Sequence, residues 1–362
     1  MRITAAVCRE GRGFPVLETL ELEPPRPGEV LVRMAAVGVC HTDIRVATRP
    51  MGPRPLVLGH EGAGVIEAVG DGVEGLAPGQ PVLMSYAFCG ECPACRRHAR
   101  PYCLEAVARN FGGARPDGSS PLSKNGELIH GAFFGQSSFA SHAVCDARQV
   151  VKTPTDLPLE VLAPLGCGVQ TGAGAVLNSL KVGQGQTIAV FGAGSVGLSA
   201  VMAARVAEAA RIIAIDVNPA RLELAKALGA TEVIDPRSAD PVAAVMELTG
   251  FGVDFVLNTT DIAAVYLQGI ACLGPKGAFA FVTSPGPDLP VNLSALMLGG
   301  RRVQGIVQGD SEPQDFIPRL IQLYREGRFP LDRLITLYPF ARIAEAMHDS
   351  EAGRVVKPVL KM

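Results

Sequence analysis

The stretch Thr187-Ile-Ala-Val-Phe-Gly-Ala-Gly-Ser-Val-Gly197 joins a run typical of a buried β-strand to a GxGxxG glycine pattern, and a helical run follows it. In this context Gly192 permits the tight turn, Gly194 lets the backbone approach a pyrophosphate, and Gly197 lets the helix pack on the strand. The helix N-terminus supplies N–H donors and partial positive charge. The stretch therefore predicts a dinucleotide site at the start of a βαβ unit.

A carboxylate follows the next predicted strand. Residues 211–215 are apolar and end in Asp216, 19 residues after Gly197. A carboxylate there accepts hydrogen bonds from both hydroxyls of the adenosine ribose and repels a 2′-phosphate, which favours NAD over NADP. Arg221 lies about one helical turn further and can flank the ribose, but we expect Asp216 to dominate. A glycine-rich turn without a ligand is the weaker alternative in this context.

The part of the chain that contains this motif and the parts on either side of it show different secondary-structure patterns. Strand-like and helix-like runs alternate from residue 187 to about residue 282, as in βαβ units with a parallel sheet. Residues 1–150 instead carry short β-type runs separated by Gly and Pro, such as 30–37, 64–69 and 80–85. A helix near 316–326 and a strand near 355–360 close the chain. We therefore predict an α/β protein in which a Rossmann, doubly wound parallel-sheet domain is inserted into a mostly-β domain.

Length and charge narrow the class of protein. A chain of 362 residues usually forms two domains. Its net charge of −2 creates no field that attracts nucleic acid or an anionic membrane, so we expect a small-molecule partner. The uncharged run 187–204 could suggest a membrane helix, but its glycines and its change from strand to helix pattern argue against one. Without a signal-like start, and with nine cysteines, the chain is expected in the cytoplasm.

Four cysteines form the pattern in this chain that is least expected by chance, with the spacing CxxCxxCx7C: Cys89, Cys92, Cys95 and Cys103. Four neighbouring thiolates repel one another unless a soft divalent cation neutralises them, and tetrahedral zinc is the commonest such ion. A disulfide framework fits poorly with so long a chain and an odd cysteine count. Three arginines within 89–103 are too few for a nucleic-acid-binding zinc module. Four thiolates leave no open coordination position, so we predict a structural zinc and place the chemistry elsewhere.

Three further potential metal ligands are scattered along the first half of the chain: Cys40, His60 and Cys167. Two thiolates and one imidazole would leave a fourth position free for water or substrate, as a catalytic zinc requires. A histidine in a glycine-rich turn is more often a surface or packing residue, and a buried cysteine is usually a small hydrophobe. Spacing alone leaves both interpretations open.

Taken together, these features resemble the zinc-dependent medium-chain alcohol dehydrogenases over essentially the whole chain. The resemblance rests on Cys40-His-Thr-Asp43, Gly59-His-Glu-Gly-Ala-Gly64, the four cysteines and the Rossmann glycines. Cys40-His-Thr-Asp-Ile44 and Leu165-Gly-Cys-Gly-Val-Gln-Thr-Gly-Ala-Gly174 are similar to the aryl-alcohol (benzyl-alcohol) and allylic terpene-alcohol members. The resemblance implies a GroES-like catalytic domain at 1–168 with a zinc lobe near 86–106, a Rossmann NAD-binding domain at 169–307, and a return to the catalytic domain at 308–362.

The resemblance also implies a catalytic centre. Cys40, His60 and Cys167 match the catalytic zinc ligands, and Glu61 matches an adjacent acid that can approach zinc as ligands exchange. Asp43 matches the carboxylate that orients His60. Zinc lowers the pKa of the alcohol, so that hydride can pass to the nicotinamide. The implied reaction is alcohol plus NAD to aldehyde plus NADH, with two zinc ions per chain.

Further residues match positions around the cofactor. Thr42 matches the hydroxyl that accepts the alcohol proton and passes it to the nicotinamide ribose. His41 matches a pyrophosphate contact, where a histidine should bind more weakly and with more pH dependence than the common arginine. Lys357 resembles a second pyrophosphate contact, with a solvated lysine as the alternative. Thr171 and Val196 match positions beside the nicotinamide ring.

One departure from the family concerns the route of the proton. Several members carry a histidine shortly after the first zinc thiolate, which completes a path to solvent. This chain has Arg45 and Val46 there, five and six residues after Cys40. The proton exit is therefore left to His41 or to a ribose that opens directly to water.

The substrate class follows from the resemblance, with aryl or allylic primary alcohols of the benzyl or geranyl type as the first choice. Tyr86 or Phe88 could form an aromatic wall, or both are ordinary core residues. Short aliphatic alcohols and the glutathione adduct of formaldehyde are alternatives within the class. A zinc-stabilised NAD-binding protein without dehydrogenase activity is the alternative from another class. Family members form homodimers or homotetramers, and we expect one of these.

Overall fold

The computed structural model describes residues 1–362 except residues 12, 50, 285 and 287. The described chain divides into two compact units. The first comprises Met1–Cys167, Glu312–Ile321 and Asp332–Met362, and the second comprises Gly168–Ser311 and Gln322–Leu331. The first boundary falls one residue before the expected one, and the chain re-enters the first unit at Glu312, where residue 308 was expected. The domain ranges given above stay a prediction.

Two largely antiparallel sheets form the first unit. One has the strand order β4-β1-β2-β7-β8, with the bounds Leu56–Val57, Arg2–Cys8, Val16–Leu22, Leu122–Lys124 and Glu127–Ile129. The other has the order β10-β6-β5-β3-β18-β17, and β9 also pairs with β3. Its bounds are Val150–Lys152, Pro81–Met84, Gly62–Val69, Glu29–Gly38, Lys357–Lys361 and Ile335–Pro339, with β9 at His142–Asp146.

The register of the second sheet gathers segments that are far apart in the sequence. Strand β3 is the longest of this sheet and is buried over most of its length, because its run of Val, Leu, Met and Ala packs into the core. Val37 of β3 pairs with Gly62 of β5, and Gly38 pairs with Val359 of β18. The residues after β3, before β5 and at the start of β18 therefore meet at one end of the sheet.

The helices of the first unit are short: α1 (His41–Thr48), α2 (Pro93–Arg96), α3 (Ala106–Phe111), α4 (Leu159–Leu162) and α12 (Ile343–Glu351). Helix α1 begins directly after Cys40, and Asp43 in its first turn caps it. Helix α11 (Pro313–Arg325) begins in the first unit and ends in the second.

The second unit contains a six-stranded parallel sheet with the order β13-β12-β11-β14-β15-β16. The bounds in this order are Glu232–Ile234, Arg211–Ile215, Thr187–Phe191, Val253–Asn258, Leu273–Phe281 and Arg302–Gly305. Counted along the chain from β11, this is the order 3-2-1-4-5-6 of a doubly wound sheet. The predicted Rossmann topology is thus present.

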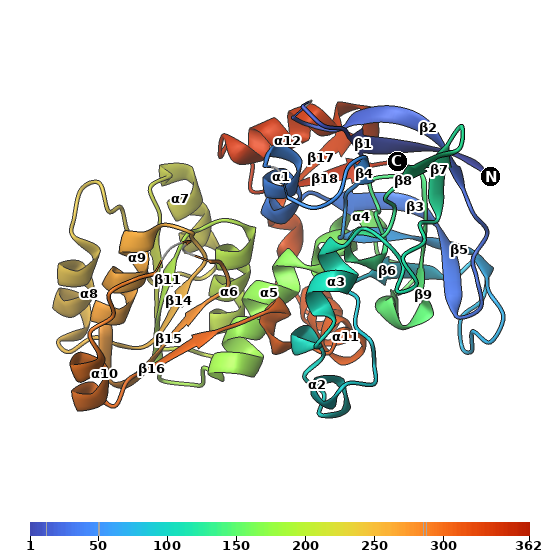
Figure 1. Cartoon of the computed structure of the whole chain (residues 1–362). Helices are drawn as coiled ribbons and strands as arrows, with labels where there is room; N and C mark the ends of the chain where they lie inside the picture. The colour runs from blue at the N-terminus through green and yellow to red at the C-terminus, as the bar shows by residue number, and fades with distance from the viewer. Residues whose placement is uncertain (12, 50, 285, 287) are drawn as a thin grey trace. The chain divides into compact units, whose positions relative to one another are not determined.

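Helices cover both faces of this sheet, as Figure 1 shows for α6 on one side and α8 and α9 on the other. The helices of the unit are α5 (Gly168–Gly174), α6 (Ser195–Val206), α7 (Pro219–Leu228), α8 (Pro241–Thr249), α9 (Ala263–Ala271) and α10 (Leu293–Gly299). Strands β11 and β12 are buried almost throughout, which explains their continuous apolar sequences. The uncharged run 187–204 is split between β11 and α6, and no helix in the described residues has the length and apolar character needed to cross a bilayer.

Candidate active site and metal centres

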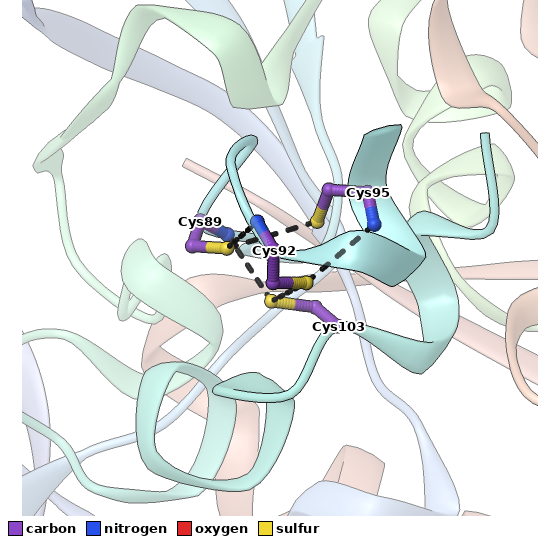
Figure 2. Close-up of side chains that lie close together, drawn as sticks. All are labelled: Cys89, Cys92, Cys95 and Cys103. Atoms are coloured by element: carbon purple, nitrogen blue, oxygen red, sulfur yellow. Dashed lines mark hydrogen bonds between the residues drawn. The ribbon is translucent and has the colours of Figure 1, made fainter. Parts of the chain in front are cut away.

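The four cysteines of the lobe form a compact sulfur cluster, shown in Figure 2. One sulfur from each of Cys89, Cys92, Cys95 and Cys103 lies within 4.8 Å of every other. The Cys89 and Cys95 sulfurs are 3.8 Å apart, and those of Cys92 and Cys103 are 4.0 Å apart. Four sulfurs at about 2.3 Å from a tetrahedral zinc ion lie about 3.8 Å from one another. The geometry therefore fits a four-thiolate zinc site.

The backbone of the lobe favours the thiolate form. The N–H groups of Cys95 and Leu104 both donate to the sulfur of Cys92, each at 3.5 Å. These two hydrogen bonds lower the pKa of the Cys92 thiol to about 6. The N–H groups of Glu91 and Cys92 donate to the sulfur of Cys89 in the same way. The loop thus favours the anionic form of Cys92 and Cys89, whereas burial raises the pKa of Cys95 to about 12 and also raises that of Cys103.

Phe88, expected as a wall of the substrate site or as a core residue, packs within the lobe. The guanidinium carbons of Arg100 and Arg148 lie 4.6 and 5.7 Å from the centroid of its ring. Arg148 also donates to the carbonyl of Cys89 at 2.9 Å, which ties the lobe to the strand that precedes Arg148. Tyr86 is buried beside Phe88, with 6.2 Å between the ring centroids. Both rings therefore contribute to packing around the lobe.

A second cluster contains the other three predicted ligands. Cys40, His60, Glu61 and Cys167 each contribute one donor atom to a group whose members all lie within 4.8 Å of one another. The strand pairing explains why, because Cys40 follows β3 and His60 precedes β5 at the same end of the sheet. Nε2 of His60 is buried and makes no hydrogen bond with any described residue. Two thiols and a free imidazole nitrogen fit the ligand preference of zinc.

Asp43 holds two of these ligands in place. Its Oδ1 lies 3.0 Å from Nδ1 of His60 and accepts a hydrogen bond from the N–H of Gly59 at 3.1 Å. Its Oδ2 accepts from the N–H of Cys40 at 3.0 Å. This contact places the proton of His60 on Nδ1 and leaves Nε2 for a metal. Asp43 therefore links the segments of Cys40 and His60 and sets the tautomer of the imidazole.

The cluster is electrostatically coupled. A hydrogen bond from Cys167 and the charge of His60 lower the pKa of the Cys40 thiol well below its ordinary value, against the effect of burial. The same hydrogen bond and burial raise the pKa of Cys167. Burial alone would lower the pKa of His60, but the charges of Asp43 and Cys40 outweigh it and raise that pKa. Metal binding here must displace protons, so we expect it to weaken as the pH falls.

Lys357 is buried beside this cluster, and it is not the solvated lysine of the alternative interpretation. Its side chain is 1% exposed, and its Nζ lies 2.5 Å from Oε2 of Glu61. Nζ also donates to the carbonyl of Val39 at 3.0 Å. The pKa of Lys357 is raised because the charges of Glu61 and Cys40 outweigh burial, which alone would lower it. Lys357 is thus the counter-ion of Glu61, and its contact with a pyrophosphate stays a prediction.

Helix α1 carries the two predicted proton-handling residues. His41 is its first residue and is exposed, and Thr42 is half-buried. The Thr42 hydroxyl makes no hydrogen bond within the described part of the chain, so it is available to a ligand. The roles of both residues stay predictions.

The glycine turn of the second unit has one glycine that the fold itself does not require. At Gly192 φ is +89°, and a Cβ on Gly197 would lie 1.8 Å from the carbonyl oxygen of Gly192. Gly194 has an ordinary φ of −78°, and nothing lies within 4 Å of the place a Cβ would occupy. The open space above Gly194 adjoins the N-terminus of α6, which fits a bound pyrophosphate.

Asp216 lies beside this turn, directly after β12. Its Oδ2 accepts a hydrogen bond from the N–H of Ala193 at 2.6 Å, and its Oδ1 accepts from the N–H of Asn218 at 2.8 Å. The carboxylate is therefore held at the glycine turn in a defined orientation. Arg221 lies in the first turn of α7, and its Nε is buried without a hydrogen-bond partner among the described residues.

Thr171 and Val196 belong to adjacent helices of the second unit, α5 and α6. A Cβ on Gly172 would lie 2.0 Å from the carbonyl oxygen of Val196, so these two helices are in backbone contact. Thr171 is buried and Val196 is half-buried. Their placement beside a nicotinamide ring stays a prediction.

Comparison with known proteins shows the family to which the chain belongs. Residues 26–155 match the alcohol dehydrogenase GroES-like domain, and residues 195–326 match the zinc-binding dehydrogenase family. Geraniol dehydrogenase from Castellaniella defragrans is 47% identical over 360 residues, which cover 98% of this chain and 96% of that protein. This chain belongs to the zinc-binding alcohol dehydrogenases. Membership confirms the predicted family, the fold class, and NAD and zinc as cofactors.

Solved structures of other members of the family are similar over their full length. An alcohol dehydrogenase zinc-binding domain protein from Burkholderia ambifaria is 49% identical, with a TM-score of 0.98 over 100% of this chain and 99% of that one. Benzyl alcohol dehydrogenase from Acinetobacter calcoaceticus is 44% identical, with a TM-score of 0.96 and the same coverage. The chain is therefore an alcohol dehydrogenase, and the alternative of an NAD-binding protein without this activity is set aside.

Sequence reasoning missed an aromatic cluster against His60 in this alcohol dehydrogenase. The ring of Phe134 stacks on the imidazole, with 4.3 Å between centroids and 22° between planes. Phe133 meets His60 edge-on at 5.7 Å, and Phe111 meets both phenylalanines edge-on. A pair of phenylalanines followed by Gly135 was the available signal, but nothing in its spacing connects it with His60.

Proposed function

We propose that this alcohol dehydrogenase oxidises aryl or allylic primary alcohols, of the benzyl or geranyl type, to aldehydes with reversible hydride transfer to NAD. The observation that carries the proposal is the donor set of half-buried Cys40 with buried His60 and Cys167, in which Nε2 of His60 has no hydrogen-bond partner among the described residues. The substrate class is supported by relatives named geraniol dehydrogenase and benzyl alcohol dehydrogenase, both more than 40% identical over nearly the whole chain.

The first unit would supply the residues around the reacting alcohol. Cys40, His60 and Cys167 would hold the catalytic zinc, and Asp43 would keep the imidazole in the required tautomer. Bound zinc supplies a Lewis acid that lowers the pKa of the alcohol hydroxyl. The free hydroxyl of Thr42 would accept the proton released there and pass it onward.

Glu61 contributes a carboxylate close enough to serve as an alternative ligand during exchange. One of its carboxylate oxygens lies within the ligand group, and its Oε2 is bound by Lys357. A Cβ on Gly38 would lie 2.0 Å from the same oxygen, so the glycine leaves the room that this carboxylate occupies. Lys357 would hold Glu61 in position while the three other ligands bind the metal.

The second unit would bind NAD through its glycine turn. The open space at Gly194 would receive the pyrophosphate at the N-terminus of α6, and Asp216 would bind the adenosine ribose. NAD supplies the acceptor for the hydride. His41 is expected to add a pH-dependent pyrophosphate contact, and Arg221 is expected to flank the ribose.

The aromatic cluster supports the choice of substrate. Phe134 and Phe133 are buried against His60, while Phe111 is 38% exposed. Rings at this position give the surroundings of the metal ligand an apolar, π-rich character. Such surroundings favour the ring of a benzyl alcohol or the alkene of an allylic alcohol over ethanol, whose small apolar part gains little from them.

The test is a panel of benzyl, cinnamyl, geranyl and ethyl alcohols, each assayed with NAD and with NADP. We expect kcat/KM to be at least 100-fold higher for the aryl and allylic alcohols than for ethanol, which corresponds to about 2.7 kcal/mol of transition-state stabilisation. We also expect higher rates with NAD, because Asp216 repels a 2′-phosphate. A preference for ethanol would refute the substrate class, and higher rates with NADP would refute the role of Asp216.

A homodimer or homotetramer is part of the proposal. Strand β16 is an edge of the parallel sheet, and helix α10 has no buried residue within the described chain. Leu293, Met297 and Leu298 of α10 are each more than 70% exposed, an apolar face that a second copy would cover. Light scattering of the purified protein tests this, and a monomer at micromolar concentration would contradict it. The cytoplasm is the proposed location, because free cysteines are typical of a reducing compartment.

A further inference from the structure

A glutamine side chain is buried directly behind the proposed catalytic ligands. Gln136 is 1% exposed and follows the 3-10 turn Phe133–Gly135. Its Nε2 donates to the carbonyl of His60 at 3.1 Å and to the carbonyl of Ser85 at 3.0 Å. Its Oε1 accepts from the N–H of Gly62 at 3.2 Å. A buried amide is costly unless it is hydrogen-bonded, so these three contacts fix Gln136 in one orientation.

Ser85 extends this connection to the third ligand. It lies immediately after β6, and its side chain is fully buried. Its hydroxyl donates to the carbonyl of Gly166 at 2.9 Å, and Gly166 precedes Cys167. The path from His60 to Cys167 therefore runs through Gln136, Ser85 and Gly166.

The segments joined by this path are in backbone contact. A Cβ on Gly166 would lie 2.4 Å from the carbonyl oxygen of Met84 and 3.3 Å from Cα of Glu61. At such distances a small shift of one segment displaces its neighbour, because packed interiors transmit strain. The His60–Glu61 segment, the end of β6 and the Gly166 segment are therefore packed directly on one another.

Asp43 and the pair Gln136–Ser85 connect different segments of the ligand set. Asp43 connects Cys40 with the His60 segment through its two carboxylate oxygens. The hydrogen bonds of Asp43 in the described chain go to Cys40, Gly59 and His60, and none goes to the Cys167 segment. Gln136 and Ser85 supply a hydrogen-bonded connection to that segment.

We propose that Gln136 and Ser85 are positioning residues that set the distance between His60 and Cys167 and thereby control how firmly the catalytic metal is held. This inference rests on the proposed catalytic zinc site. It assigns the two residues no contact with substrate or cofactor. Loss of a group that orients metal ligands typically costs 10- to 100-fold in metal affinity.

The test is the rate of zinc release from the holoenzyme to an excess of a chromogenic chelator. The kinetic phase that disappears in Cys40→Ala is the release of the catalytic zinc, called the catalytic phase below. We expect Gln136→Met, which keeps the length of the side chain and removes its hydrogen bonds, to release the catalytic zinc about 10-fold faster. Gln136→Glu loses both donors and is expected to do the same. Ser85→Ala removes one hydroxyl without changing the fold and should accelerate the phase about threefold.

Asn110 provides a matched control. It is also a buried amide with three hydrogen bonds, to the N–H and carbonyl of Ala87 and to the carbonyl of Ala106. None of these partners belongs to a catalytic-ligand segment. Asn110→Leu should therefore leave the catalytic phase within twofold of the wild-type rate, although it loses as many hydrogen bonds as Gln136→Met.

The outcomes separate this inference from the proposed metal site. A catalytic phase in Gln136→Met and Ser85→Ala within twofold of wild type overturns the positioning role. Equal acceleration by Asn110→Leu also overturns it, because the effect would then reflect general destabilisation. If the wild-type protein shows no phase of zinc release that disappears in Cys40→Ala, the proposed catalytic site itself is wrong. As a second readout, kcat should fall in Gln136→Met while the KM for NAD is unchanged.

Discussion

The buried ion pair of Lys357 and Glu61 offers a decisive perturbation, because the two interpretations of Lys357 make opposite predictions. As the counter-ion of Glu61, Lys357 is needed for stability, and as a pyrophosphate contact it is needed for NAD binding. Lys357→Met removes the charge and keeps most of the side-chain volume. Lys361→Met on the same strand, β18, is the matched control, since Lys361 is largely exposed and pairs with Glu160 at 3.0 Å.

The structure sets the size of the expected effect. Charges 2.5 Å apart attract by about 7 kcal/mol at an effective dielectric constant of about 20. Desolvation of the two groups, which are 1% and 0% exposed, offsets much of this attraction. Removal of one partner leaves the other charge buried and typically costs about 3 to 5 kcal/mol. The exposed pair of Lys361 should contribute less than about 1 kcal/mol.

The assay is urea unfolding of the zinc-loaded protein, combined with the Kd for NAD from nucleotide titration. We expect Lys357→Met to lower the free energy of unfolding by about 3 to 5 kcal/mol, and to leave the Kd for NAD within threefold of wild type. The double variant Lys357→Met/Glu61→Gln should recover part of the loss, because it also removes the orphaned carboxylate. Unchanged stability together with a Kd raised 10-fold or more would rule out the counter-ion role and support the pyrophosphate contact.

Two further predictions concern the glycine turn and a surface ion pair. Gly194→Ala should change the free energy of unfolding by less than about 1 kcal/mol, because its Cβ would meet open space, but it should weaken NAD binding about 10-fold. Gly197→Ala should lower both the free energy of unfolding and the affinity for NAD. Denaturant titration and NAD titration check this, and full NAD affinity in Gly194→Ala would contradict it. Hydrogen bonds and charge from Arg9 and Lys124 hold the pKa of the Glu18 carboxyl at about 2. The ionised carboxylate therefore contributes fully to the free energy of unfolding above its unfolded pKa of about 4, and this contribution disappears as the pH falls toward 2. Glu18→Gln should therefore cost about 1 to 2 kcal/mol at pH 7, with a difference from wild type that shrinks below pH 4; a constant difference down to pH 3 would contradict this.

Local sequence patterns predicted the parts of this enzyme whose chemistry depends on neighbouring residues. The glycine turn with its flanking strand and helix identified the dinucleotide-binding fold, because turn, strand and helix are consecutive in the chain. The spacing of Cys89 to Cys103 predicted a metal lobe in the same way. Cys40, His60 and Cys167 needed the family resemblance, since they are far apart in sequence and only the strand register brings them together.

Contacts between distant segments could not be predicted from the sequence. The register of β18 against β3 buries Lys357 beside Glu61, although a lysine near a chain end gives no sign of burial. The stacking of Phe134 on His60 joins residues that no periodicity relates. Nothing in the sequence around Gln136 predicts burial, yet its three hydrogen bonds join separate segments of the core.

We expect this dehydrogenase to hold two zinc ions, one in the four-cysteine lobe and one on Cys40, His60 and Cys167. Elemental analysis of the purified protein tests it most directly. We predict two zinc equivalents per chain in the wild type and one in Cys40→Ala, with the lobe zinc retained. A single equivalent that survives Cys40→Ala would contradict the account.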